Sequence, residues 1–307
     1  LYAAPNGKTV TPLHPEFGNR QKFYNSFRNP TSLFANNTIN LVGFGFRIKD
    51  AGYFTFGAMM KIDDNTRLPK DLFGYLLEGS NASLTTPTTL NLSAFGSNTQ
   101  VYTEIAGGYS HKINEVWTVG GKLKFLMGTA YVGAQHFDLS LTSTMDQMKF
   151  AGHGNLLVAG PLNLAALPEN FNYETLQNYD LSKLLYDSED ITSMILDYVK
   201  PSGYGAAIDL GFTVKPVKQL QISVAVNDLG FIYWNNGVKY NASADSTFAG
   251  VGTLEYSDYV YNEQFNTDSL WSDVQRRLIR LGSAYHFDSR ENHFTKMVTT
   301  KLNVGID

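Results

Sequence analysis

Eight charged residues lie within segments that have the alternation of β-strands, and they are the side chains best placed to do chemistry. In these segments the charge shares a face with small or polar residues, and apolar residues occupy the opposite face. The eight residues are Arg47, Lys61, Glu104, Lys122, Lys124, Asp209, Arg280 and Lys301. Such a set can line a path for solutes, or its members can pair with one another. We favour pairing, because buried charges commonly neutralise each other.

Beyond these charges we find no motif for catalysis or metal binding. The absence of cysteine excludes disulfides, thiolate metal sites and cysteine nucleophiles. The histidines lack the spacing of metal ligands, and no nucleophile signature occurs. We interpret Asp63-Asp64-Asn65 as a solvated turn and Asp228, in the segment NDLG, as a turn residue. We therefore expect no enzymatic activity and no cofactor or metal.

The composition is typical of a protein that crosses a membrane with strands. Charged residues make up 17% of the chain, against about 25% in soluble proteins. Aromatic residues make up 13%, and no apolar run approaches the roughly 20 residues of a membrane helix. A secreted β-rich protein is the alternative. The net charge of -4 supplies no basic stripe for phosphate, so we expect no nucleic-acid partner.

The hairpin Val101–Met127 shows the pattern most clearly, with two strands joined at Lys112–Val116. A soluble sheet hides its apolar face in a core, whereas a membrane barrel turns that face to lipid and keeps charges in its lumen. The same division recurs in other segments, which favours the barrel. The clearest of them are Ile39–Lys49, Tyr53–Ile62, Tyr204–Val214, Arg277–Phe287 and Lys296–Asp307. We predict an all-β membrane protein, an antiparallel transmembrane β-barrel of 12–14 strands, with about 14 preferred because bacterial barrels have even numbers.

Three segments interrupt the predicted strands of this single domain, 1–307. Residues 1–38 are rich in proline and are expected to be irregular. A short amphipathic helix is predicted after Pro69, and a longer helical insertion within 162–200. We expect segments 1–38 and 162–200 to plug the barrel, to cap it or to contact a partner. The alternation also breaks off at both ends, so we expect terminal strands to be missing from the given chain.

Aromatic residues mark the expected edges of the membrane. Trp117 and the pair Tyr233 and Trp234 stand at strand ends, and tryptophan and tyrosine are enriched where lipid meets water. We assign these three residues to the membrane interfaces.

The longer motifs resemble a family of outer-membrane barrels of unknown function found in Bacteroidota. They are INLVGFGFRIK, YFTFG, PKDLFGYLLEG, TEIAGGYSHKI, WTVGGKLKFLMGTAYV, SGYGAAIDLGFTV, LQISVAVNDLGFIYW and IRLGSAYHF. The resemblance covers most of residues 39–290 and implies a precursor with a signal peptide and an outer-membrane location. It also implies a distant similarity to FadL-type long-chain fatty acid transporters, and it transfers no catalytic motif. The family's first and closing strands are not evident in this chain.

Together these observations predict an integral protein of the Gram-negative outer membrane. Its barrel is expected to be plugged and to act as a subunit or scaffold of an envelope assembly. Its expected partners are the lipid bilayer, lipopolysaccharide and other outer-membrane or periplasmic proteins. The alternative is a FadL-like passage for a hydrophobic or amphipathic small molecule, which requires a lumenal pocket lined by Phe and Leu.

Overall fold

The structure, a computed structural model, describes residues 2–3, 9–10, 19–49, 52–78, 88–143, 147–172, 175, 178–184, 200–217, 219–249, 260–261, 264–265 and 285–306. Most of these residues belong to one antiparallel sheet of 13 strands. Its members are β3 (Thr31–Ile48), β4 (Gly52–Leu68), β5 (Thr88–Asn91), β6 (Gly96–Lys112), β7 (Trp117–Ser143), β8 (Gln147–Ala159), β9 (Phe171–Asn172), β10 (Gly203–Val217), β11 (Leu220–Trp234), β12 (Gly237–Ala249), β15 (Tyr285–Glu291), β16 (Phe294–Met297) and β17 (Lys301–Ile306).

Helices and further strands are few and short. The described helical elements are α1 (Arg20–Ser26), α2 (Lys70–Glu78), η1 (Leu164–Ala166) and η2 (Leu181–Leu184). None of them is long and apolar enough to span a bilayer. Two small ladders join β1 (Tyr2–Ala3) to β2 (Thr9–Val10) and β13 (Val260–Tyr261) to β14 (Gln264–Phe265).

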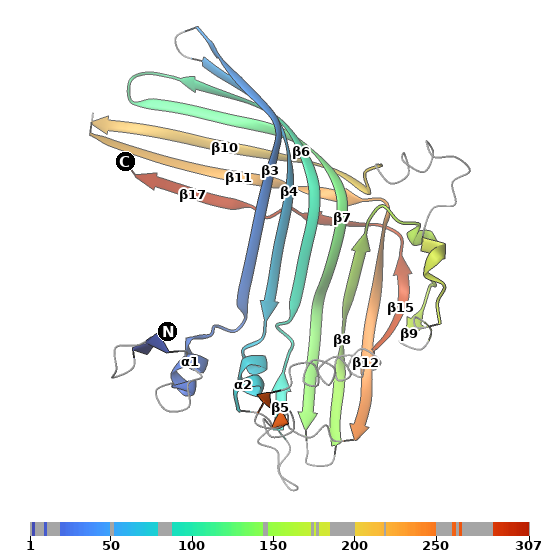
Figure 1. The fold of residues 1–307 in the computed structure, drawn as a ribbon. Coiled ribbons are helices and arrows are strands. Elements are labelled where there is room, and N and C mark those ends of the chain that lie inside the picture. Colours follow the sequence, from blue (N-terminus) through green and yellow to red (C-terminus); the bar gives the residue numbers. More distant parts are fainter. Residues whose placement is uncertain are drawn as a thin grey trace.

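Strand β7 organises the sheet, because its two halves have different neighbours on one edge. Residues 117–128 pair with β10, whereas residues 131–143 pair with β8. The sheet forks at Gly128, whose carbonyl accepts a 2.7 Å hydrogen bond from the Ser202 amide. In Figure 1, β10, β11 and β17 run to the left of β7, while β8 and β12 continue downward beside it. We call the first half of β7 with β10, β11 and β17 the upper tier, and the second half with β8, β12 and β15 the lower tier.

The outer face of the sheet is exposed in one tier and covered in the other. We call the face that carries Lys124 the inner face. In the upper tier Lys124 is buried, and its neighbour Leu123, on the outer face, is 74% exposed. In the lower tier Leu157 of β8 lies on the inner face, because it packs with Tyr131. The register with β8 places Leu139 of β7 and Tyr240 of β12 on the opposite, outer face, and both are buried.

The upper-tier pattern extends over several strands. Exposed apolar side chains on β7, β10, β11 and β17 include Val119, Leu123, Phe125, Leu210, Phe212, Leu229, Phe231, Leu302, Val304 and Ile306. Strands β8, β12 and β15 contribute no exposed large hydrophobic residue among the side chains described. Below the fork the exposed apolar residue described on β7 is Val132, at 52%. The other apolar side chains of the outer face there are covered, by Leu92 and Phe95 beside β7 and by Leu164 of η1 beside β12.

Several predictions about elements are confirmed. The hairpin forms as expected, with Lys112 opposite Thr118 in the β6–β7 ladder. Helix α2 begins directly after Pro69. An antiparallel all-β fold is confirmed. In the described residues β3 pairs only with β4, and β17 pairs only with β11, so closure of the sheet into a transmembrane barrel stays a prediction.

Other predictions need correction. Strand β3 starts at Thr31, inside the segment 1–38 that we expected to be irregular. The NDLG segment is not a turn, because β11 runs unbroken from Leu220 to Trp234. Of the helical insertion expected within 162–200, residues 185–199 lie outside the described residues.

Candidate functional site

Buried charges from five adjacent strands meet on the inner face of the upper tier. Lys61 Nζ lies 2.7 Å from Glu104 Oε2 and 2.9 Å from Asp228 Oδ1. Lys124 Nζ lies 2.6 Å from both Asp209 Oδ1 and Asp228 Oδ1, and 3.5 Å from Glu104 Oε1. Each ammonium group therefore contacts at least two carboxylates, which compensates for the loss of water around both.

Three further residues extend this set toward β17 and the lower tier. The Tyr102 hydroxyl donates a 2.9 Å hydrogen bond to Asp63 Oδ2. Lys301 Nζ lies 3.8 Å from both Asp63 Oδ1 and Asp228 Oδ2. We call the whole set the charged layer: Lys61, Asp63, Tyr102, Glu104, Lys124, Asp209, Asp228 and Lys301. Its three lysines face four carboxylates, so the charges nearly cancel.

A β-bulge aims Asp228 into this layer. Between the paired positions Leu210–Val226 and Ile208–Leu229, two residues of β11 stand opposite the single residue Asp209. Asp228 has φ 60°, and aspartate is among the few residues that tolerate this left-handed conformation. Its amide donates a 2.8 Å hydrogen bond to Asp209 Oδ1. The bulge thus turns the Asp228 carboxylate inward while Val226 and Leu229 both stay on the outer face.

The ion pairs also show how strongly the upper tier curves. The strand order β4, β6, β7, β10, β11 places four strand steps between Lys61 and Asp228. In a flat sheet those steps would separate the two strands by about 19 Å. A lysine and an aspartate side chain cannot bridge that distance, yet their charged atoms are 2.9 Å apart. The sheet therefore wraps around the charged layer.

The structure brings together five of the eight charged residues predicted from sequence. They are Lys61, Glu104, Lys124, Asp209 and Lys301. Arg47 and Lys122 are exposed and take no part in the ion pairs of the described residues. Arg280 lies outside the described residues.

Three members of the charged layer were missed. Asp63 was assigned to a solvated turn but is 3% exposed, because β4 continues through it. The two-residue spacings Lys61–Asp63 and Tyr102–Glu104 place each pair on one face of a strand, so both could have been found from alternation. Asp228 could not be found in this way, because a bulge that the sequence does not reveal changes the alternation of β11.

An aromatic layer lies directly beneath the charged layer, at the fork. Trp234 packs against Tyr131 and Phe294 with ring centroids 5.6 and 6.3 Å apart, and Tyr102 joins the same cluster. Trp234 is 0% exposed, so its assignment to a membrane interface is wrong. It follows the exposed Tyr233 in the strand and therefore points to the opposite, inner face. Trp117 and Tyr233 are each 43% exposed.

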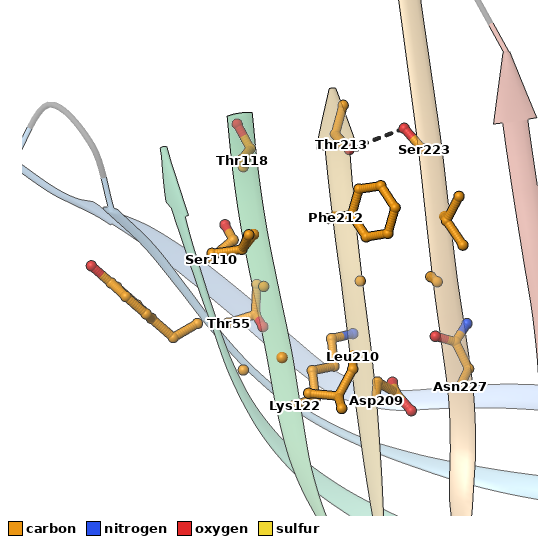
Figure 2. A pocket seen from close by; sticks show the side chains of 18 of the residues that line it. Thr55, Ser110, Thr118, Lys122, Asp209, Leu210, Phe212, Thr213, Ser223 and Asn227 are labelled. Atoms are coloured by element: carbon orange, nitrogen blue, oxygen red, sulfur yellow. Dashed lines mark hydrogen bonds between the residues drawn. The ribbon is translucent and has the colours of Figure 1, made fainter. Parts of the chain in front are cut away.

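Above the charged layer lies a groove of about 390 Å³. Its inner-face lining is small and polar, and Figure 2 shows Lys122 and Asp209 at one end, with Thr213 and Ser223 joined by a 3.0 Å hydrogen bond. Below the aromatic layer lies a second space of about 700 Å³, the lower chamber, bordered by β4, β6, β7 and β16. The charged and aromatic layers thus occupy the level between two open spaces.

The described residues include no group of three or more His, Asp or Glu side chains placed to hold a metal ion. Comparison with known proteins finds no significant match among the curated proteins or the solved structures. One family model does match, over residues 1–307, and its description is a family of unknown function. The chain therefore belongs to this family of unknown function, DUF5723.

Proposed function

We propose that the chain forms an outer-membrane β-barrel that is blocked at mid-height and serves as a subunit or scaffold of an envelope assembly. The observation that carries this proposal is a change in the exposure of the outer face at the fork. Apolar side chains of the outer face are exposed beside the charged layer, whereas in the lower tier they are buried under other segments of the chain, among them η1.

The upper tier has the surface that a lipid-facing band requires. Charges in lipid are costly, and transmembrane barrels keep them in the lumen. Leu123 and Phe44, which should be buried if the chain were soluble, are 74% and 57% exposed. Water would penalise so many exposed apolar side chains, whereas acyl chains would not.

The length of β7 supports a second, extramembrane part. Its 27 residues extend over about 90 Å at roughly 3.3 Å per residue. A tilted strand crosses a membrane with about 9–11 residues. We assign the crossing to the upper tier and a water-facing extension to the lower tier, and such an extension offers a surface for other envelope proteins.

The filled interior favours the scaffold over the alternative, a FadL-like passage for an apolar or amphipathic molecule. Such a passage needs a continuous apolar path. At mid-height the described interior instead holds paired charges and large aromatic side chains, among them Lys124, Glu104 and Trp234.

Fractionation tests the membrane part of the proposal. The chain should sediment with outer membranes, should require detergent for extraction, and should migrate differently on gels before and after heating, as folded barrels do. Extraction by salt or alkali without detergent would contradict it.

Co-purification and permeability tests separate the scaffold from the passage. Native detergent extracts should yield the chain with partners at fixed stoichiometry, and proteoliposomes should not swell in small sugars. Recovery as a lone monomer with co-purified lipid-like molecules in the interior would favour the passage instead.

A further inference from the structure

The lower chamber is the second open space of the interior, and its lining differs from that of the charged layer. It lies below the aromatic layer and has a volume of about 700 Å³. Two basic residues, Arg67 on β4 and Lys296 on β16, lie in its wall. No Asp or Glu is among its described lining residues. The groove above the charged layer, by contrast, includes Asp209 beside Lys122.

Neither cation is neutralised by a carboxylate in the described part of the chain. Lys296 Nζ donates a hydrogen bond to the neutral Gln135 side chain. No hydrogen bond or ion pair links Arg67 to another described residue. The nearby carboxylate of Asp138 accepts a 2.8 Å hydrogen bond from Ser93 Oγ instead. Two positive charges therefore border one space, and neither has a carboxylate within ion-pair distance in the described residues.

Glycine places the guanidinium of Arg67. Arg67 stands opposite Gly96 in the β4–β6 ladder. A Cβ atom built on Gly96 would lie 2.7 Å from Arg67 Nη2 and 3.2 Å from its Nε. The guanidinium thus rests over Gly96, where any other residue would displace it.

Two side-chain amides add hydrogen-bonding capacity next to Arg67. Asn65 and Asn98 face each other across the same ladder, and both line the lower chamber. The Oδ1 atoms of both are buried without a hydrogen-bond partner in the described residues. An unpaired buried amide is costly, and either amide can turn to present its NH2 group to an acceptor.

We propose that the lower chamber binds the phosphate group of a phosphate ester. A guanidinium fork, an ammonium group and amide N–H donors match the oxygens of a phosphate. The remaining wall includes Phe95, Phe137 and Met297, and it leaves room for an organic substituent. The ester can be a soluble metabolite or a lipid headgroup, since both present the same group. The site lies on the inner face of the sheet, so phosphate binding does not require the outer face to meet lipid.

Calorimetry on the full chain in detergent tests the proposal with two probes, inorganic phosphate and dihexanoyl phosphatidic acid. We expect saturable binding of at least one probe. Arg67→Gln and Lys296→Gln should each weaken it about tenfold or more, the usual effect of losing a hydrogen bond to a charged group. Lys149→Gln, which removes an exposed cation that is paired with Asp245 and does not line the lower chamber, should leave binding unchanged.

A comparison of the two probes identifies the source of the phosphate ester, and the variant Gly96→Ala tests the placement of the guanidinium. Tighter binding of phosphatidic acid would identify a lipid source, and tighter binding of inorganic phosphate a soluble one. Gly96→Ala should weaken binding while every charge is retained, because it displaces the guanidinium. If a variant fails to fold, the chain without substitutions can be tested directly. Phosphate should then protect Arg67 from modification by phenylglyoxal, measured by mass spectrometry.

The proposal is overturned if neither probe binds or protects Arg67, or if Lys149→Gln weakens binding as much as Arg67→Gln. Such a failure would leave the barrel proposal intact, since that proposal rests on the outer face. Conversely, a chain that proved soluble without detergent could still bind phosphate.

Discussion

The two halves of β7 belong to one strand, yet their apolar outer faces meet different surroundings. Up to Gly128 the outer face carries the exposed Leu123 and Phe125, and beyond it the outer face carries the buried Leu139 and Leu141. Alternation alone does not distinguish the two halves. What differs is the cover: an apolar side chain can stay exposed where lipid lies outside, and it needs protein over it where water lies outside. The comparison locates the proposed lipid boundary within a single strand, close to the fork.

The largest expected effect comes from removing one charge from the charged layer. Lys124→Met keeps the length of the side chain but leaves Glu104, Asp209 and Asp228 with too few cations. Breaking a buried ion pair from one side costs about 3–5 kcal/mol, and we expect this loss in the free energy of unfolding, measured by guanidinium titration in lipid vesicles.

A second substitution shows whether that loss is electrostatic. Asp228→Asn keeps the residue's tolerance of the left-handed conformation and removes one carboxylate. Added to Lys124→Met, it should recover stability, with a coupling energy above about 1 kcal/mol. Additive losses would mean that the layer is held by packing rather than by charge.

Arginine substitutions at exposed positions compare the two tiers. Leu123→Arg places a charge in the proposed lipid band and should cost about 2–4 kcal/mol. Ser243→Arg, at an exposed position on the inner face of β12, should change stability by less than about 0.5 kcal/mol. Equal costs in the same vesicle assay would remove the distinction between the tiers.

The smallest effect is expected at an ion pair on the lower tier. Lys239 Nζ lies 2.7 Å from Glu291 Oε1, and the glutamate is 55% exposed. Such a pair contributes about 0.2–1 kcal/mol and is screened by salt. Glu291→Gln should therefore lower stability slightly at low ionic strength and not at all near 1 M salt. The loss caused by Lys124→Met should persist in salt, because its partners are buried.

Much of the upper tier could be predicted from the sequence, because the face that each side chain takes there follows from alternation along its own strand. The positions of Lys61, Glu104 and Lys124 follow from alternation and from the cost of placing charge in lipid. The lower tier could not be oriented in this way. Tyr131 and Leu139 continue the period-two pattern of Leu123, but bulges of β7 at Thr129 and at His136–Phe137 place Tyr131 on the inner face and Leu139 on the outer face.

The rest of the site depends on contacts between distant segments. Asp228 joins the charged layer through a bulge whose only trace in the sequence is the dipeptide Asn227-Asp228, which equally suits a turn. Trp234 and Tyr233 are both large aromatic residues, and composition cannot show which of them is buried. Once the bulge has set the phase of β11, Trp234 must point inward.

The fork at Gly128 also bears on the order in which the chain folds. The second half of β7 finds its partner, β8, only a few residues further along the chain, whereas the first half waits for β10, which starts at Gly203. Local pairings form faster than distant ones. We therefore expect the β7–β8 hairpin to form early and to present the remaining half of β7 as a template. The strands of the upper tier would then pair one by one with the free edge of β7, whose other half is already folded with β8.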